Sequence, residues 1–115
     1  MKTAPLPFVA VLTLAALPAV AAAETLKNAP LVDSHCVAKV KANPDAHERS
    51  CAIQCASGGY GILTAEGDYL KFDEAGSAKA LEALKASGKE DTLRADVTGT
   101  RDGSTLKVES IALVP

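Results

Sequence analysis

The sequence predicts a small, mainly β domain with two helices, arranged as an OB-fold-like five-stranded barrel with a helix inserted between strands 1 and 2. Three observations lead to this prediction. Five short segments have the apolar pattern of strands, and two others have the capping signals or apolar spacing of helices. Their order is strand, helix, strand, strand, helix, strand, strand, so a helix separates the third strand from the fourth as in an OB-fold. An open α+β sheet is the alternative.

The first 23 residues have the three-part pattern of a cleavable signal peptide. Lys2 supplies a positive charge, residues 6–19 form an uncharged apolar run, and Ala21 with Ala23 offers the small-residue motif of a cleavage site. Prolines interrupt the run, which is shorter than the roughly 20 residues that span a bilayer. We therefore expect cleavage after Ala23, a periplasmic or secreted protein, and no membrane contact after cleavage.

A strand and a helix are predicted directly after the signal. Residues 24–30 are expected to be a flexible leader, followed by a strand at 31–34 that opens a single domain over residues 31–115. The Asn-Pro-Asp sequence at 43–45 is a helix-start signal, because Asn caps a helix and Pro is tolerated in its first turn. A helix is therefore expected from Pro44 or Ala46 to Ala56, where a pair of glycines ends it.

The remaining elements form two hairpins that flank a helix. Each hairpin has a glycine in its turn, and the helix has one apolar stripe and a glycine after its end. The alternation of apolar residues shifts by one near Ser110–Ile111, which predicts a β-bulge. The expected ranges are strands 60–64 and 68–72, a helix over 74–87, and strands over 93–97 and 106–111 joined by a turn at 101–103.

Charge and aromatic content argue against nucleic-acid binding. The chain has a formal net charge of −2, and its charges alternate in sign without a basic block. Only Tyr60, Tyr69 and Phe72 follow the signal, too few for a platform on which bases stack. Acidic pairs lie at the ends of the predicted elements, and no nucleophile motif is present. We therefore expect a non-enzymatic protein.

The residues capable of specific chemistry lie between positions 35 and 55. They are all the Cys and His residues of the chain: His35, Cys36, His47, Cys51 and Cys55. One interpretation is a disulfide, the usual state of cysteines in an exported protein. Cys36 paired with Cys51 or Cys55 closes a loop of about 15 to 20 residues, which stabilises the fold by about 3 kcal/mol. Cys51 paired with Cys55 is disfavoured on a regular helix, and any pairing leaves one thiol over.

A second interpretation is a metal site, because thiolate and imidazole together suit zinc or cuprous copper. His47, Cys51 and Cys55 follow one another at steps of four, so a continuous helix would place them on one face. Such a helix separates His47 from Cys55 by about 12 Å. The candidate ligand set is therefore Cys51, Cys55 and Cys36, with His35 or His47 as the fourth ligand. Redox exchange with partner thiols is a further alternative, although the Cys-x-x-Cys spacing of redox couples is absent. Free buried thiols without a role are another alternative.

Several segments together carry a resemblance to a known group. They include Leu31–Cys36, the His47-x3-Cys51-x3-Cys55 segment with Gly59, Gly61–Thr64, Tyr69–Asp73, Val97–Thr100 and Lys107–Ile111. In these the chain resembles small exported bacterial OB-fold-like proteins of uncharacterised function. The resemblance implies that Cys36, His47, Cys51 and Cys55 belong to one set, and it supplies no ligand.

We therefore expect an exported binding module whose Cys/His cluster binds zinc or copper. The alternative is a disulfide-stapled OB-like domain that binds a peptide, glycan or protein partner through its barrel face. The only Met is Met1, which argues against copper because copper proteins often carry Met-rich stretches.

Overall fold

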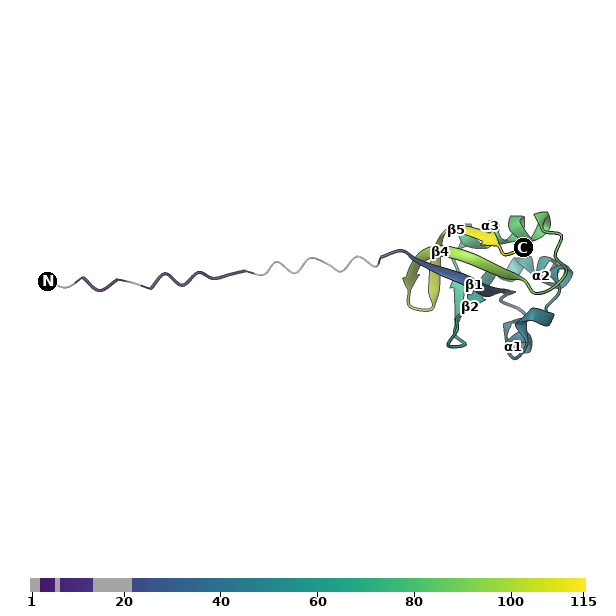
Figure 1. The fold of residues 1–115 in the computed structure, drawn as a ribbon, viewed down its shortest axis with the longest axis horizontal. Coiled ribbons are helices and arrows are strands. Elements are labelled where there is room, and N and C mark those ends of the chain that lie inside the picture. Colours follow the sequence, from purple (N-terminus) through teal and green to yellow (C-terminus); the bar gives the residue numbers. More distant parts are fainter. Residues whose placement is uncertain (1–2, 6, 14–21) are drawn as a thin grey trace.

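The computed structural model describes residues 3–5, 7–13 and 22–115 (Figure 1). The predicted signal peptide lies partly outside the described residues, and its described parts contain no helix or strand. Within the described ranges, no helix is both long and apolar enough to cross a membrane.

Five strands, three α-helices and two short 3₁₀ helices make up the described fold. In chain order they are β1 (Glu24–Asp33), α1 (Val37–Val40), η1 (Pro44–Ala46), α2 (Arg49–Gln54), η2 (Ala56–Gly58), β2 (Tyr60–Leu63), β3 (Tyr69–Phe72), α3 (Glu74–Ala86), β4 (Arg94–Asp102) and β5 (Thr105–Leu113).

The strands form a closed ring in the order β1-β2-β3-β5-β4. β1 closes it, because this strand pairs antiparallel with β2, where Leu31 lies opposite Ile62, and with β4, where Leu26 lies opposite Val97. β3 pairs in parallel with β5, and the other neighbours are antiparallel. A mainly β five-stranded fold is therefore confirmed, and the alternative of an open sheet is wrong.

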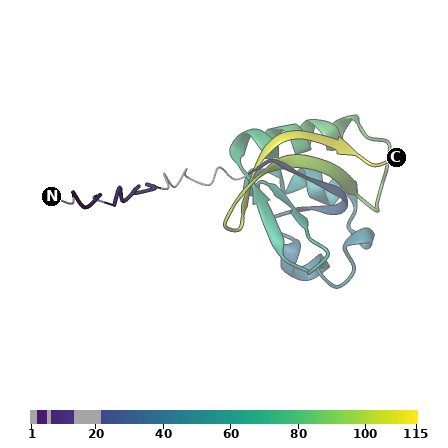
Figure 2. The same cartoon turned by 60° about the vertical axis from the view of Figure 1, so that its left-hand side comes forward.

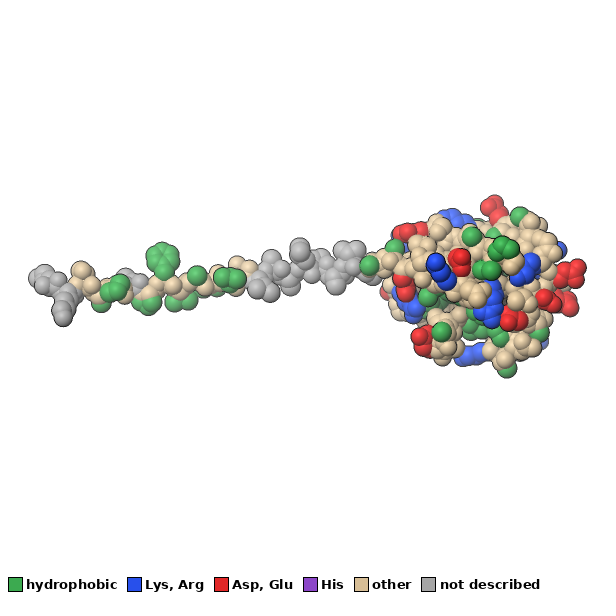
Figure 3. Space-filling view, in the orientation of Figure 1, with side chains coloured by type: hydrophobic (Ala, Val, Ile, Leu, Met, Phe, Trp, Pro, Cys, Tyr) green, Lys and Arg blue, Asp and Glu red, His purple; other side chains and the backbone are tan. Residues whose placement is uncertain are grey.

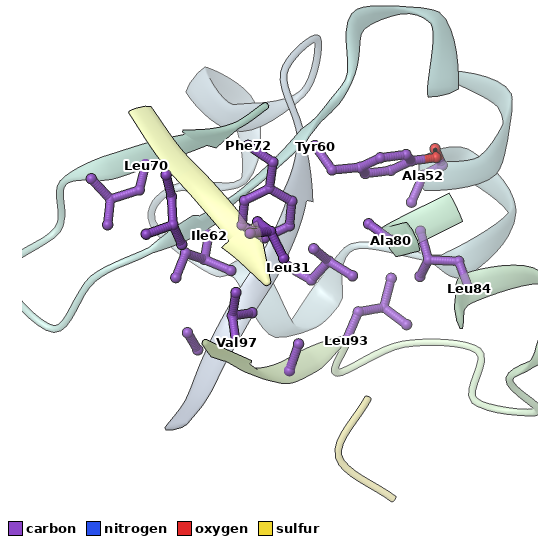
Figure 4. Packing of buried hydrophobic residues seen from close by; sticks show 14 residues of the cluster. Leu31, Ala52, Tyr60, Ile62, Leu70, Phe72, Ala80, Leu84, Leu93 and Val97 are labelled. Atoms are coloured by element: carbon purple, nitrogen blue, oxygen red, sulfur yellow. Dashed lines mark hydrogen bonds between the residues drawn. The ribbon is translucent and has the colours of Figure 1, made fainter. Parts of the chain in front are cut away.

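The interior of the ring is filled from every strand, and α3 covers it beside β5 (Figure 2). Asp73 begins α3 by accepting a hydrogen bond from the backbone N–H of Gly76 at 3.1 Å, as an N-cap does. The apolar stripe of α3 then places Ala80 and Leu84 against the strands (Figure 4). The buried cluster comprises Ala29, Leu31, Ala52, Tyr60, Ile62, Leu70, Phe72, Ala80, Leu84, Leu93, Ala95, Val97, Leu106 and Val108.

The expectation of a flexible leader at residues 24–30 is wrong, because these residues form most of β1. Glu24 and Thr25 lie opposite Gly99 and Thr98 of β4, so their backbone groups take part in the sheet. The register shifts between Leu26 and Ala29, where Asn28 has a φ of 53°. This irregularity breaks the alternation of apolar residues, which is why the sequence pattern did not indicate a strand.

The single inserted helix between Pro44 or Ala46 and Ala56 is also wrong. The chain from 37 to 58 forms two short α-helices and two 3₁₀ helices. The Asn-Pro-Asp signal starts only η1, and His47 and Glu48 then have extended backbone, with ψ angles of 123° and 146°. The extended backbone at His47 allows this side chain to turn toward the end of β1, which a continuous helix would prevent.

Downstream of residue 59, the predicted elements differ from the structure only at their ends. Both hairpins form, α3 ends one residue earlier than expected, and the last turn lies at Gly103–Ser104 rather than at 101–103. The bulge lies close to its predicted place. Thr98 pairs with Ser110 and Gly99 with Val108, so Glu109 is the extra residue.

Candidate metal centre

The centre of the site is Asp33, the last residue of β1. Asp33 is fully buried, and His47, which approaches from the inserted segment, is 6% exposed. Nε2 of His47 lies 2.7 Å from Oδ1 of Asp33. Since a carboxylate only accepts hydrogen bonds, Nε2 donates this one. The other carboxylate oxygen, Oδ2, accepts a hydrogen bond from the backbone N–H of Cys36 at 3.1 Å.

The local chain explains how Cys36 reaches this carboxylate. β1 ends at Asp33, and the chain turns so that the N–H of Cys36 also points at the backbone carbonyl of Asp33, 3.2 Å away. Cys36 then precedes α1, and its side chain is partly buried. The turn therefore places a thiol next to a buried carboxylate.

These three residues form a compact group of candidate metal ligands. One ligand atom each from Asp33, Cys36 and His47 lies within 4.8 Å of the other two. Oxygen, sulfur and imidazole nitrogen are the donors that bind Zn²⁺ in tetrahedral sites. Asp33 and His47 are buried, and Cys36 is partly exposed.

Cys55 caps the end of α2 and affects the titration of Cys36. Burial, the adjacent Asp33 and the Cys55 side chain, in that order, raise the pKa of the Cys36 thiol to about 11. Cys55 contributes least to this shift, and it is not part of the group formed by Asp33, Cys36 and His47. Without a cation the Cys36 thiol therefore stays protonated at neutral pH, and a bound metal ion would displace that proton.

The other two predicted ligands lie apart from this group. Cys51 is exposed on α2. His35 is exposed and its ring lies over Gly58, where an added β-carbon would be 2.5 Å from Nε2. The structure therefore brings Cys36 and His47 together with Asp33, and this group does not include Cys55, Cys51 or His35.

Asp33 is the functional candidate that sequence reasoning missed. It directly follows the apolar pair Leu31 and Val32 and comes three residues before Cys36. An acidic residue at the end of a buried strand needs a partner, and the nearby Cys and His residues were the available signal.

Two tyrosines donate hydrogen bonds to the backbone around the site. The buried Tyr60 hydroxyl donates a hydrogen bond to the Ala52 carbonyl at 2.7 Å, which ties α2 to β2. Burial, followed by the charges of Asp33 and Cys55, raises the pKa of Tyr60 to about 12, so this hydroxyl stays a donor. The Tyr69 hydroxyl donates to the Val32 carbonyl at 3.1 Å and lies 3.1 Å from Oγ of Ser34. The end of β1 is thereby held in place.

In the part of the chain that the structure describes, all three cysteines are free thiols. On the surface drawn in Figure 3, acidic and basic side chains are intermixed and form no single basic patch.

Comparison with protein-family models, with curated proteins and with solved structures gave no match.

Proposed function

We propose that this chain is a small exported, non-enzymatic binding module of the OB-fold class that holds a zinc ion with Asp33, Cys36, His47 and Cys55. The strand order, the parallel pairing of β3 with β5 and the helix between β3 and β4 support the OB-fold assignment. The pattern of residues 1–23 supports export to the periplasm or beyond.

The mutual approach of the three ligand atoms to within 4.8 Å is the observation that carries the proposal. A buried carboxylate is rare unless it is paired or binds a metal. Here the carboxylate contacts an imidazole, and a ligand atom of Asp33 lies within 4.8 Å of the Cys36 thiol. With Cys55 as the fourth ligand, which the proposal adds to these three, the protein would fill a tetrahedral shell as in structural zinc sites.

Zinc fits this donor set better than copper does. Cuprous copper prefers soft thiolate and thioether ligands, whereas this group includes a carboxylate oxygen. The only Met of the chain is Met1. Copper is therefore the second metal to test.

The second candidate function is a disulfide-stapled domain of the same fold that binds a peptide, glycan or protein partner. The observation that favours it is that Cys36 and Cys55 are both partly buried free thiols, whereas Cys51 is exposed. An oxidising compartment would join these two residues, and the bridge would fasten the inserted segment to the end of β1.

Metal titration of the purified, reduced protein tests the proposal. The full chain is expressed with its own start, purified under reducing conditions and titrated with zinc against a chromogenic chelator, and stoichiometry is read by native mass spectrometry. We expect one zinc per chain. Cys36→Ser and Cys55→Ser should each weaken zinc binding at least about tenfold, whereas the matched control Cys51→Ser should leave it unchanged. Absence of zinc binding, or a dependence on Cys51, would contradict the proposal.

A further inference from the structure

Residues 36–44 form a loop, the insert loop, in which no side chain is buried. It contains Cys36, the whole of α1 and Pro44, which begins η1. By contrast, α3 buries Gly76, Ala80 and Leu84. Burial of apolar side chains is the dominant favourable term in folding. The insert loop is therefore held in place much less firmly than α3.

The backbone hydrogen bonds of the insert loop are mostly local. Lys39, Val40, Lys41 and Asn43 each donate a backbone hydrogen bond to a carbonyl inside the loop. In the part of the chain that the structure describes, the Cys36 N–H is the only backbone donor of the loop that bonds to a residue outside it. α1 is four residues long, and so short a helix is marginal without packing.

The two ends of the insert loop are held unequally. At the Cys36 end, a single N–H donates to Oδ2 of Asp33 at 3.1 Å and also points at the Asp33 carbonyl. Directly after the other end, the Asp45 carboxylate accepts two hydrogen bonds from Arg94, and its carbonyl accepts one from the Thr92 N–H at 2.9 Å. The loop is therefore most easily released at Cys36, while Asp45 stays attached to the start of β4.

Release of the Cys36 end would separate one candidate ligand from the other two. Asp33 is fully buried at the end of β1, and His47 contacts it at 2.7 Å, so these two stay together when the loop moves. Cys36 lies within 4.8 Å of both only while its N–H remains bonded to Asp33. The group of three ligand atoms therefore exists only when the insert loop is closed.

We propose that the insert loop opens at Cys36 while the rest of the domain stays folded, and that a bound zinc ion holds it closed. The inference rests on the proposed zinc site, because the ion would join Cys36 to Asp33 and His47. It adds regulation to that site: occupancy of the site sets whether residues 36–44 are ordered.

Hydrogen–deuterium exchange of the reduced, full-length protein tests the local opening. Without metal, the amides of residues 37–43 should exchange at least about a hundredfold faster than the slowest amides of α3. Urea below the unfolding transition should speed exchange in α3, which requires exposure of much buried surface, and should barely change exchange in the loop. Loop amides that exchange at the rate of α3, with the same dependence on urea, would overturn the inference.

Addition of zinc tests whether the ion holds the loop closed. At a free zinc concentration 100 times the dissociation constant, an ion that binds only the closed form lowers the open population about a hundredfold. Exchange of the loop amides should slow by about that factor, and the matched control Cys51→Ser should behave in the same way. Cys36→Ser should keep the fast exchange and lose the effect of zinc.

The outcomes separate this inference from the zinc site on which it rests. Zinc that binds in the chelator titration but leaves exchange of the loop amides unchanged contradicts the inference and leaves the proposed function standing. Absence of zinc binding in the titration contradicts the proposed function, and control of the loop by the metal fails with it.

Discussion

His47 and Asp33 form a buried hydrogen-bonded pair across the inserted segment, with Nε2 of the imidazole 2.7 Å from Oδ1 of the carboxylate. This single contact joins the end of β1 to the chain between η1 and α2. It also explains why no long helix forms there. The imidazole reaches the carboxylate only because the backbone at His47 and Glu48 is extended.

Removal of this imidazole should destabilise the fold. In His47→Ala the Asp33 carboxylate stays buried and keeps only the hydrogen bond from the Cys36 backbone. Loss of one partner from a buried pair costs about 3–5 kcal/mol. Urea unfolding without metal should show this decrease in the free energy of unfolding. The matched control His35→Ala changes an exposed histidine and should stay within about 1 kcal/mol; equal losses in both variants would refute the role of the pair.

Zinc should stabilise the reduced protein by binding to the proposed ligands. At a free zinc concentration 100 times the dissociation constant, binding to the folded state alone adds about 2.7 kcal/mol to the free energy of unfolding. Thermal unfolding with and without zinc measures this as a rise in Tm. Cys36→Ser should remove the rise and Cys51→Ser should preserve it. A rise that survives in Cys36→Ser would place the ion elsewhere.

The ion pair between Arg94 and Asp45 should make stability depend on acid pH. Nε of Arg94 lies 2.9 Å from Oδ1 of Asp45, and Nη2 lies 3.1 Å from Oδ2. The hydrogen bond from Arg94, more than its charge, lowers the pKa of Asp45 in the folded state. The stabilisation is therefore complete above the pKa of an unfolded Asp, about 3.9, and is lost as the pH falls through the lower folded-state value.

Asp45→Asn measures that contribution. Both side chains are partly exposed, so the neutral-pH loss should be no more than about 1 kcal/mol. Denaturation of both proteins from pH 7 to pH 2 should show a constant difference above about pH 5 that shrinks below about pH 4. The hydrogen bond from the Thr92 backbone to the Asp45 carbonyl, at 2.9 Å, remains in the variant. A difference that grows on acidification would contradict this account.

Gly76 in α3 should not tolerate a side chain. A β-carbon there would lie 2.6 Å from Cγ2 of Val108 and 2.7 Å from Oδ1 of Asp73. Gly76→Ala should therefore lower the free energy of unfolding by about 1–3 kcal/mol, despite the higher helix propensity of Ala. Gly88→Ala is the matched control, because nothing lies within 4 Å of its added carbon. Equal stability of the two variants in urea would show that the contact at Gly76 relaxes freely.

The parts of the fold that sequence predicted best are those with local causes. The hairpin after Tyr60, α3 with its Asp73 cap, and the bulge near Ser110 each follow from turn residues, capping or alternation within a few positions. β1 was missed before residue 31 because its partner, β4, is far away in sequence. Periodicity carries no information on a pairing that depends on a distant strand and a bulge at Asn28.

The candidate site was predicted only in part, because it too depends on tertiary contacts. Proximity in sequence grouped the Cys and His residues, but the steps of four from His47 to Cys55 assumed one helix. The structure has no such helix; His47 instead contacts Asp33 at the end of β1, and Asp33 thereby joins the group. A buried carboxylate near a thiol is a tertiary feature, so only the three-dimensional arrangement groups Asp33 with Cys36 and His47.

The closure of the ring through β1 has a consequence for the order of folding during synthesis. A chain is made from its amino end, so Glu24–Asp33 is complete well before β4, Arg94–Asp102. The pairing of Leu26 with Val97 must then wait until nearly the whole domain has been made. Such long-range closure is intrinsically slow. The ring is therefore among the last features of the fold to form.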